Sequence, residues 1–303
     1  MISNNILKLF LIISIQFITG CSFTISNFTD NLNKAVKANN DPKTVMQALP
    51  PYLILMDGFI EGDAEDEDIL IASAKLMNAY AGLLAAEHDM MAVALEDNEA
   101  NIYQRKKLKQ QEIKLVEKAL KRASSANCIY EEYLCNLTTL KYDDFIKRIQ
   151  QVEDDDIAML YSLGTVWAAW IKLNSQDWNA VAQLPQVKLI MQTVILLNEN
   201  WDNAGAHMYL GVLNSLMPAS YGGKPEKGRE SFEAAIKITQ GKNLMAKVLF
   251  AEFYARLTFN EALHQKLISE VLNYKETPHD FVLINTLAIE KAKYLQASAE
   301  DYF

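Results

Sequence analysis

The motif ITGC at residues 18–21 has the clearest chemical meaning in the chain, because its cysteine thiol can carry a lipid. A short apolar run begins at Ile6 and is interrupted only by Lys8. An early lysine, an apolar core and a small residue before the cleavage point are typical of a secretory signal. We therefore predict a lipoprotein signal peptide over residues 1–20 and lipidation of Cys21. The lipid would tie the protein to a bacterial membrane without crossing it.

Two alternatives to the lipoprotein signal are an ordinary N-terminal membrane anchor and a signal peptide whose cysteine is incidental. The apolar run is short for a span, which needs about 20 apolar residues. The residue after Cys21 is Ser22, not the aspartate that retains many lipoproteins at the inner membrane. We expect a protein of the bacterial cell envelope that faces the periplasm, on the outer membrane.

The other two cysteines, Cys128 and Cys135, are seven positions apart. On one continuous helix their Cα atoms would be about 10 Å apart, too far for a disulfide. We therefore expect two packed, unpaired thiols, and a disulfide only if the chain turns between them. No histidine pair has the spacing of zinc ligands. The four histidines are His88, His207, His264 and His279.

No arrangement of polar residues has the spacing of a catalytic or metal-binding motif. The acidic runs 61–68 and 154–156 lack the alternating oxygen ligands of a calcium loop, so we interpret them as solvated helix starts. No nucleophile elbow or phosphate-binding loop is present. His207, beside a Leu-Gly pair, is expected to be a core or groove histidine. We predict no enzymatic activity, no cofactor and no metal.

The composition favours long helices. Of 303 residues, 50% are hydrophobic, and only 11 glycines and 7 prolines interrupt the chain. The net charge of −9 opposes binding to nucleic acid and to anionic lipid headgroups. No later run approaches spanning length without charges, so the lipid is the only membrane contact we expect. Polar residues 21–40 are predicted to be a flexible tether, and residues 41–303 a helical domain.

From Asp41 onward the pattern predicts helix after helix and no strand. Pro50 and Pro51 are expected to end one short helix and start another. Apolar residues then recur at steps of three and four, the period of one helix face. The further predicted helices cover residues 69–83, 98–124, 157–171, 185–198, 203–216, 225–239, 243–257, 260–273 and 279–297.

One helix pair has a distinct signature. A Leu-Gly pair at 210–211 precedes Gly228, Phe232 and Ala235, whose spacing is four and then three. The tetratricopeptide repeat uses small residues where two helices approach closely and an aromatic residue between them. A second Leu-Gly pair ends at Gly164, 47 positions before Gly211, which exceeds the regular period of 34. We predict an all-α fold, an irregular tetratricopeptide-like superhelix of antiparallel helix pairs.

Several motifs match those of one known family. They are ALP at 48–50, DG at 57–58, LY at 160–161, WAAW at 167–170, LP at 184–185, the segment 201–213, Pro218, YGG at 221–223, EKGR at 226–229, Phe232, Ala235, Ile236, Gly241 and DYF at 301–303. With these motifs the chain resembles the TRAP-transporter-associated tetratricopeptide proteins, called TatT, over nearly all of 41–303. Gly228 departs from the pattern, since the family more often has alanine there.

The resemblance implies a lipid-anchored periplasmic helical protein. Its expected partner is the soluble solute-binding protein of a tripartite ATP-independent periplasmic (TRAP) transporter. It also implies an apolar cleft or pore for a hydrophobic or carboxylate-bearing ligand. The alternative with the same anchor and helices is a scaffold lipoprotein of an envelope assembly complex. No nucleic-acid partner is expected, and the sequence leaves a homo-oligomer open.

Aromatic and methionine side chains are the groove candidates. Aromatic residues at groove edges bury a large area with few rotatable bonds, and methionine suits adaptable apolar pockets. The alternative for these residues is ordinary packing within helix pairs. The candidates for a ligand or partner groove are Tyr161, Trp170, Tyr209, Met217 and Tyr221.

Overall fold

The structure is a computed structural model that describes residues 31–94, 98–276 and 278–303. The predicted signal peptide and Cys21 lie outside these residues. The described residues form helices and contain no strand, which confirms the all-α prediction.

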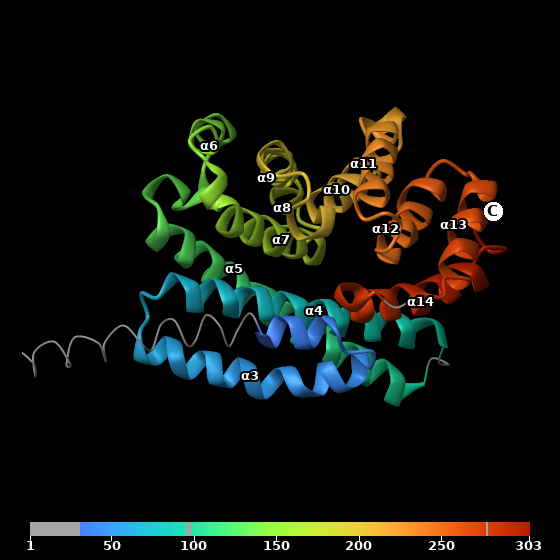
Figure 1. Ribbon diagram of the computed structural model, residues 1–303, viewed down its shortest axis with the longest axis horizontal. Helices are drawn as coiled ribbons and strands as arrows, with labels where there is room; N and C mark the ends of the chain where they lie inside the picture. The colour runs from blue at the N-terminus through green and yellow to red at the C-terminus, as the bar shows by residue number, and fades with distance from the viewer. Residues whose placement is uncertain (1–30, 95–97, 277) are drawn as a thin grey trace, which may run out of the picture.

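Three long helices form one layer of the molecule (Figure 1). They are α3 (Pro42–Gly62), α4 (Glu67–Ala94) and α5 (Glu99–Tyr130), and α4 packs against both of the others. Side-chain caps start two of them: Asp41 accepts a hydrogen bond from the backbone of Lys43, and Asn98 accepts one from Asn101. Such caps satisfy backbone N–H groups that have no partner within the helix.

Helix α3 passes through both prolines, so the predicted break at Pro50 and Pro51 is wrong. A proline in a helix interior removes one backbone hydrogen bond and disfavours the helix by about 3 kcal/mol. Burial outweighs this penalty here, because α3 places an apolar face against the core. The buried residues of that face are Val45, Leu49, Leu53 and Met56.

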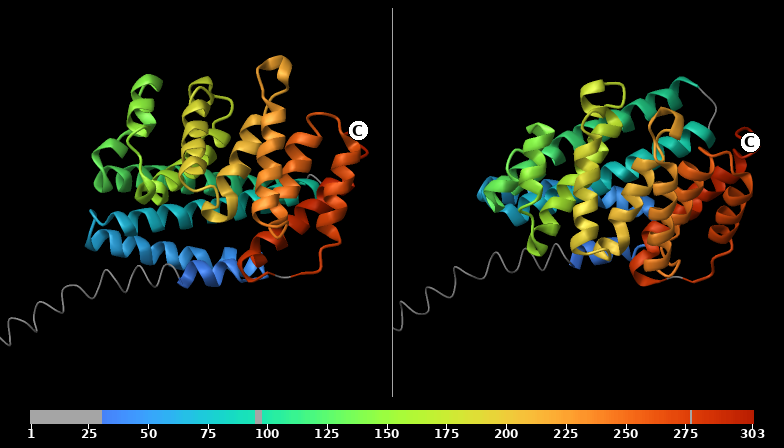
Figure 2. Two further views of the ribbon diagram at one scale, coloured as in Figure 1. Left: turned by 45° about the horizontal axis from the view of Figure 1, so that its top comes forward. Right: turned by 90° about the horizontal axis from the view of Figure 1, so that it is seen from above.

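The remaining helices form the rest of the molecule (Figures 1 and 2). They are α6 (Tyr142–Ile149), α7 (Ile157–Leu173), α8 (Trp178–Val181), α9 (Leu184–Leu197), α10 (Trp201–Asn214), α11 (Pro225–Ile238), α12 (Leu244–Leu249), α13 (Glu261–Leu272) and α14 (Val282–Ala297). A π-helix, Phe250–Ala255, continues α12. Short 3₁₀ turns lie at Glu132–Leu134, Leu137–Thr139, Asp154–Asp156, Ala219–Tyr221 and His279–Phe281. Helices α6 and α8 lie outside the helices predicted from the sequence.

The glycines of the predicted helix pair lie where α10 and α11 approach most closely. A Cβ atom added to Gly211 would be 2.5 Å from the ring of Phe232, and one added to Gly228 would be 2.9 Å from the carbonyl oxygen of Gly211. Gly164 has the same role between α7 and α9, where an added Cβ would be 2.6 Å from Ile190. These contacts confirm that small residues mark close helix approach.

The last helix returns to the first ones. Helix α14 contacts both α3 and α4, and Leu283 and Leu287 pack against the large core cluster. That cluster extends from α3 to α10, while a second cluster joins α11 to α14. Helix α14 therefore packs against the first helices of the described chain, while the last residues pack against the region of α13, where Phe303 meets His264.

Cys128 and Cys135 form a disulfide, so the expectation of two free thiols is wrong. Helix α5 ends at Tyr130, and Glu131 has an extended backbone. The chain therefore turns between the two cysteines, which brings their Cα atoms to 3.9 Å. This is the turn that the sequence left open as the one condition under which the two cysteines could pair.

Two expectations about polar segments are corrected. Within the predicted tether, residues 31–37 are helical, and Val36 packs against the core. Within the acidic run 154–156, Asp156 is buried. It accepts hydrogen bonds of 2.7 Å from the Tyr133 hydroxyl and from the backbone of Glu153. Asp156 is therefore a cap inside the fold, not a solvated helix start.

Two described segments are long and apolar enough to cross a membrane by length and composition alone, Glu67–Ala92 and Trp178–Leu197. Both segments contain charged residues, such as Lys75 and Lys188, so neither is the charge-free run that the sequence was expected to lack. Core helices of soluble proteins meet the same criteria, and both segments include buried core residues such as Met77 and Met191.

Candidate functional site

A cavity of about 200 Å³ lies where α14 meets the start of α3 and the second half of α4. Its apolar lining consists of Pro42, Met46, Leu83, Ala86, Met90 and Leu287. Its polar lining consists of Asn40, Asp41, Lys43, Glu87, Thr286 and Glu290. An apolar pocket with a few polar groups is the usual form of a small-molecule site.

The charge around the cavity is mainly negative. Three carboxylates, from Asp41, Glu87 and Glu290, face one ammonium group, that of Lys43. Hydrogen bonds from Thr44 lower the pKa of Asp41, so this carboxylate stays ionised at neutral pH. The lining therefore suits a neutral or cationic ligand better than an anionic one.

A second polar cluster joins α7, α10 and the N-terminal segment. The Tyr161 hydroxyl donates a 3.2 Å hydrogen bond to the carboxylate of Asp202. The other oxygen of this carboxylate forms a 3.2 Å ion pair with Lys37. Tyr209 meets Tyr161 edge to face, with 6.3 Å between ring centroids. The N-terminal segment is thus fixed to the start of α10.

The backbone of α10 is strained at this cluster. Asp202, Asn203 and Ala204 have φ angles of 45°, 56° and 62°, in the left-handed region that side chains disfavour. Each such residue costs about 1–2 kcal/mol. A Cβ atom on Gly205 would lie 2.0 Å from the Tyr161 oxygen, so only glycine fits there. Strain of this kind is often found at functional sites.

The titratable groups of the cluster do not form an acid–base pair. Burial and nearby Asp202 raise the pKa of Tyr161 well above its ordinary value, and those two factors raise the pKa of Tyr209 to about 12. Also on α10, but with no contact to these tyrosines among the described interactions, His207 has a pKa lowered by burial, and its Nε2 is buried without a hydrogen-bond partner. At neutral pH both tyrosines are protonated and His207 is uncharged. These groups can donate and accept hydrogen bonds.

The structure brings together only two of the five predicted groove residues. Tyr161 and Tyr209 are in contact, whereas Trp170 packs half-buried against the core. Met217 and Tyr221 lie exposed in the connection between α10 and α11. None of the five lines the cavity. A single shared groove therefore remains a prediction.

The sequence model of the TRAP transporter T-component family matches residues 38–303. The chain belongs to this family. The match covers every cavity residue and all five predicted groove residues. It identifies an accessory component of a TRAP transporter in the bacterial cell envelope. No curated protein matches the chain.

Sequence reasoning missed the cavity of this family member. Its lining comes from residues 40–46, 83–90 and 286–290, and nothing local in the sequence indicates that α14 returns to α3. The one available signal was Met46 and Met90 near helix ends, since methionine fills irregular apolar space. Within the described part of the chain, no three histidine, cysteine, aspartate or glutamate side chains gather as a metal site.

Proposed function

We propose that this protein is a lipid-anchored accessory component of a TRAP transporter, faces the periplasm and binds the transporter's solute-binding protein. The family match over residues 38–303 carries the proposal, because it extends over nearly the whole helical domain. The ITGC motif at 18–21 supports the lipid anchor, and Ser22 favours the outer membrane.

The disulfide between Cys128 and Cys135 supports a location outside the cytoplasm. Disulfides persist in oxidising compartments such as the periplasm and are rare in the reducing cytosol. This observation is independent of the signal motif and agrees with it.

The connection between α10 and α11 is our proposed partner-binding surface. Three large apolar side chains are exposed there, Leu216, Met217 and Tyr221, the last of them 78% exposed. The backbone of Gly223 donates a hydrogen bond to Pro218, and that of Lys224 donates one to Asn214, both at 3.1 Å. A fixed loop that presents an aromatic residue has the features of an interface anchor.

The cavity beside α14 is our proposed ligand site. Its apolar lining fits a hydrophobic molecule, and its excess of carboxylates disfavours the carboxylate-bearing class. We therefore propose a hydrophobic ligand that is neutral or carries a basic group.

Affinity capture from native membranes tests the proposed partner. The lipidated full-length chain, with an affinity tag, is captured from envelopes of the source bacterium after mild cross-linking. We expect the TRAP solute-binding protein to be recovered. Tyr221→Ala is expected to reduce that recovery about tenfold, the effect of losing about 1.4 kcal/mol of binding.

Tyr103→Ala is the matched control, since Tyr103 is also an exposed tyrosine, 65% exposed, but lies on α5. This variant is expected to recover as much solute-binding protein as the parent. Recovery of membrane-assembly proteins in place of a solute-binding protein would contradict the proposal and favour the scaffold alternative.

A further inference from the structure

In its central part, helix α3 is apolar on its outward side as well as on its buried side. Residues 44–56 contain no charged side chain. Opposite the buried residues, Ile54 is 72% exposed and Leu55 is 42% exposed. At 100° per residue, the exposed residues of α3 share one side of the helix. They are Lys43, Thr44, Gln47, Ala48, Pro51, Ile54, Leu55, Gly58, Glu61 and Gly62, so the apolar part of this side runs from Ala48 to Gly58 between one lysine and one glutamate.

A helix that is apolar on all sides is normally covered on all sides. In α3, one side packs against α4, and its outer side is exposed in the described structure. Large exposed apolar surfaces mark contacts with a protein or a membrane. The outer face of α3 therefore requires an occupant.

The adjacent helix, α5, is strongly basic in an acidic protein. It contains eight lysine and arginine residues and three glutamates, a charge of +5 in a chain whose net charge is −9. Four exposed lysines follow one another at steps of seven, four and three, which places them on one side of the helix. We call Lys107, Lys114, Lys118 and Lys121 the lysine stripe.

The lysine stripe borders the outer face of α3. Lys118 of the stripe forms a 2.7 Å ion pair with Asp57, which lies one helical turn after Ile54. Arg122 of α5 also pairs with Asp57. The apolar surface of α3 is therefore adjacent to a row of positive charges, the arrangement of proteins that lie on anionic membranes.

We propose that the outer face of α3 and the lysine stripe of α5 together form a membrane-contacting surface. The occupant is a bilayer surface that contains anionic phospholipid. The apolar side chains Ile54 and Leu55 would enter the headgroup region, and the lysines would lie over lipid phosphates. The inference rests on the lipid anchor of the proposed function, because that anchor brings the protein to a bilayer.

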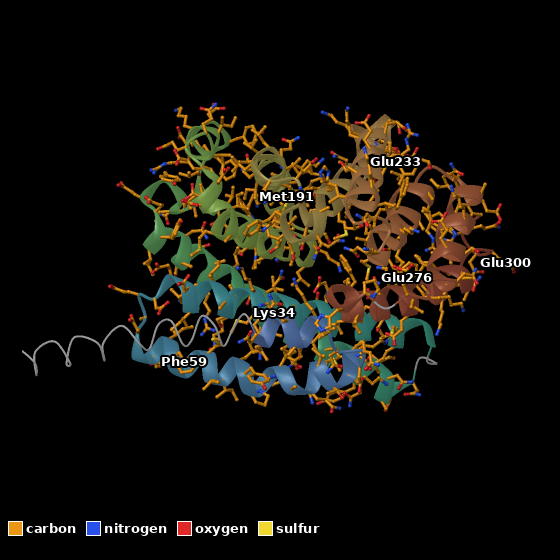
Figure 3. The ribbon with its side chains drawn as sticks, viewed as in Figure 1. Lys34, Phe59, Met191, Glu233, Glu276 and Glu300 are labelled. Atoms are coloured by element: carbon orange, nitrogen blue, oxygen red, sulfur yellow. A yellow bond between two sulfur atoms is a disulfide. The ribbon has the colours of Figure 1, made fainter. Side chains whose placement is uncertain are left out.

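The length of chain between the anchor and the fold agrees with this surface. Ten peptide steps separate Cys21 from residue 31 and can span at most about 35 Å. Residues 31–37 then lead directly into α3. Figure 3 shows Lys34, in that helical segment, in the same layer of the molecule as Phe59 of α3. The bilayer is thus held near the layer that carries the surface.

Charge favours a bilayer over a second copy of the chain. A twofold dimer with antiparallel α3 helices would place each lysine stripe beside the stripe of its partner, and like charges across an interface are unfavourable. An anionic bilayer instead neutralises the charge of the lysine stripe. The net charge of −9 opposes binding to anionic lipid for the protein as a whole, but eight of its lysine and arginine residues lie on this one helix.

A fluorescent probe on α3 tests the surface in the lipidated full-length protein. Because Cys21 carries lipid and the other two cysteines are paired, Ile54→Cys offers one reactive thiol. It is labelled and reconstituted in vesicles of phosphatidylethanolamine and phosphatidylglycerol that contain a lipid-borne quencher. Leu196→Cys, at an 84% exposed apolar position on α9, is the matched control.

We expect several-fold stronger quenching of the probe at position 54 than of the probe at 196. Replacing Lys107, Lys114 and Lys121 together by glutamine is expected to reduce the quenching at position 54, as is replacing phosphatidylglycerol by phosphatidylcholine. Far-UV circular dichroism checks that the variants keep their helices.

The outcomes distinguish this surface from the anchor. If the lipidated protein fails to float with vesicles, the proposed anchor is wrong and the inference fails with it. If it floats but the probes at 54 and 196 are quenched equally, the surface is wrong and the anchor stands. Shielding of the probe at 54 in detergent without a bilayer would show that a second copy is the occupant, which also overturns the proposal.

Discussion

The hydroxyl of Tyr161 donates a hydrogen bond to Asp202, whose own backbone lies in the left-handed region. The same carboxylate pairs with Lys37 of the N-terminal segment. One strained residue thus joins α7, α10 and the chain that leads to the predicted lipid. Because the ion pair is half-exposed, it contributes at most about 1 kcal/mol, and the buried tyrosine is the stronger contact.

Gly205→Ala tests the tight packing at this cluster. The new methyl group would overlap the Tyr161 oxygen, so the buried tyrosine must leave its place or the backbone of α10 must shift. We expect the free energy of unfolding to fall by about 2–3 kcal/mol, as for other overpacked sites. Urea denaturation measures the change.

Gly82→Ala is the control for Gly205→Ala. Gly82 is exposed within α4, and an added Cβ would meet nothing within 4 Å. This variant should gain about 0.5–1 kcal/mol, because alanine is the better helix former. Equal effects of the two substitutions would contradict the close contact between Gly205 and Tyr161.

Alkaline pH should destabilise the fold through its buried tyrosines. The pKa of Tyr161 is raised by burial and by Asp202, and that of Tyr209 is raised to about 12, so the folded state keeps protons that the unfolded state loses. The contribution of these two tyrosines to stability is therefore constant below about pH 10 and declines above it. Each tyrosine contributes a slope approaching ~1.4 kcal/mol per pH unit.

Denaturation at several pH values between 9 and about 12 measures this decline. Tyr161→Phe removes one of the titrating groups, so its stability should fall less steeply with pH than that of the parent. An identical slope in the variant would show that Tyr161 is not held protonated by the fold.

Reduction of the Cys128–Cys135 disulfide should destabilise the protein. Loss of a cross-link that closes so short a loop costs about 2–3 kcal/mol in the chain-entropy estimate. The midpoint of thermal unfolding should therefore fall in the presence of a reductant. A variant with both residues changed to alanine should show the lower midpoint with or without reductant. If the midpoint of the parent protein stays the same after complete reduction, the disulfide does not stabilise the fold as predicted.

Filling the cavity beside α14 should block a hydrophobic ligand. Ala86→Phe places a ring into a space of about 200 Å³. We expect binding of a neutral fluorescent dye such as Nile red to weaken at least about tenfold, a loss of about 1.4 kcal/mol. Ala100→Phe, at an exposed position near the start of α5, is the control and should leave dye binding unchanged. Equal binding by both variants would show that the cavity is not the site.

The sequence predicted the features that depend on local spacing. Gly211, Gly228 and Phe232 are recognisable because helical periodicity fixes which of them share a face, and the structure packs them as expected. The predicted break at Pro50 and Pro51 failed because burial of the α3 face outweighs the local preference of proline.

The features that depend on distant contacts could not be predicted. The cavity exists only because α14 returns to α3 and α4, far away in the sequence. The disulfide depends on where α5 ends, and no proline or glycine lies between Cys128 and Cys135 to indicate the turn. The strained residues Asn203 and Ala204 lie at the start of the helix predicted over residues 203–216, where nothing in the pattern indicates a left-handed backbone.

Native mass spectrometry of the protein extracted from the membranes of its source bacterium tests the proposed function most directly. We predict a mass that equals the lipidated chain bound to the solute-binding protein of a TRAP transporter. A lipidated chain that is found repeatedly with membrane-assembly proteins, and never with a solute-binding protein, would contradict it.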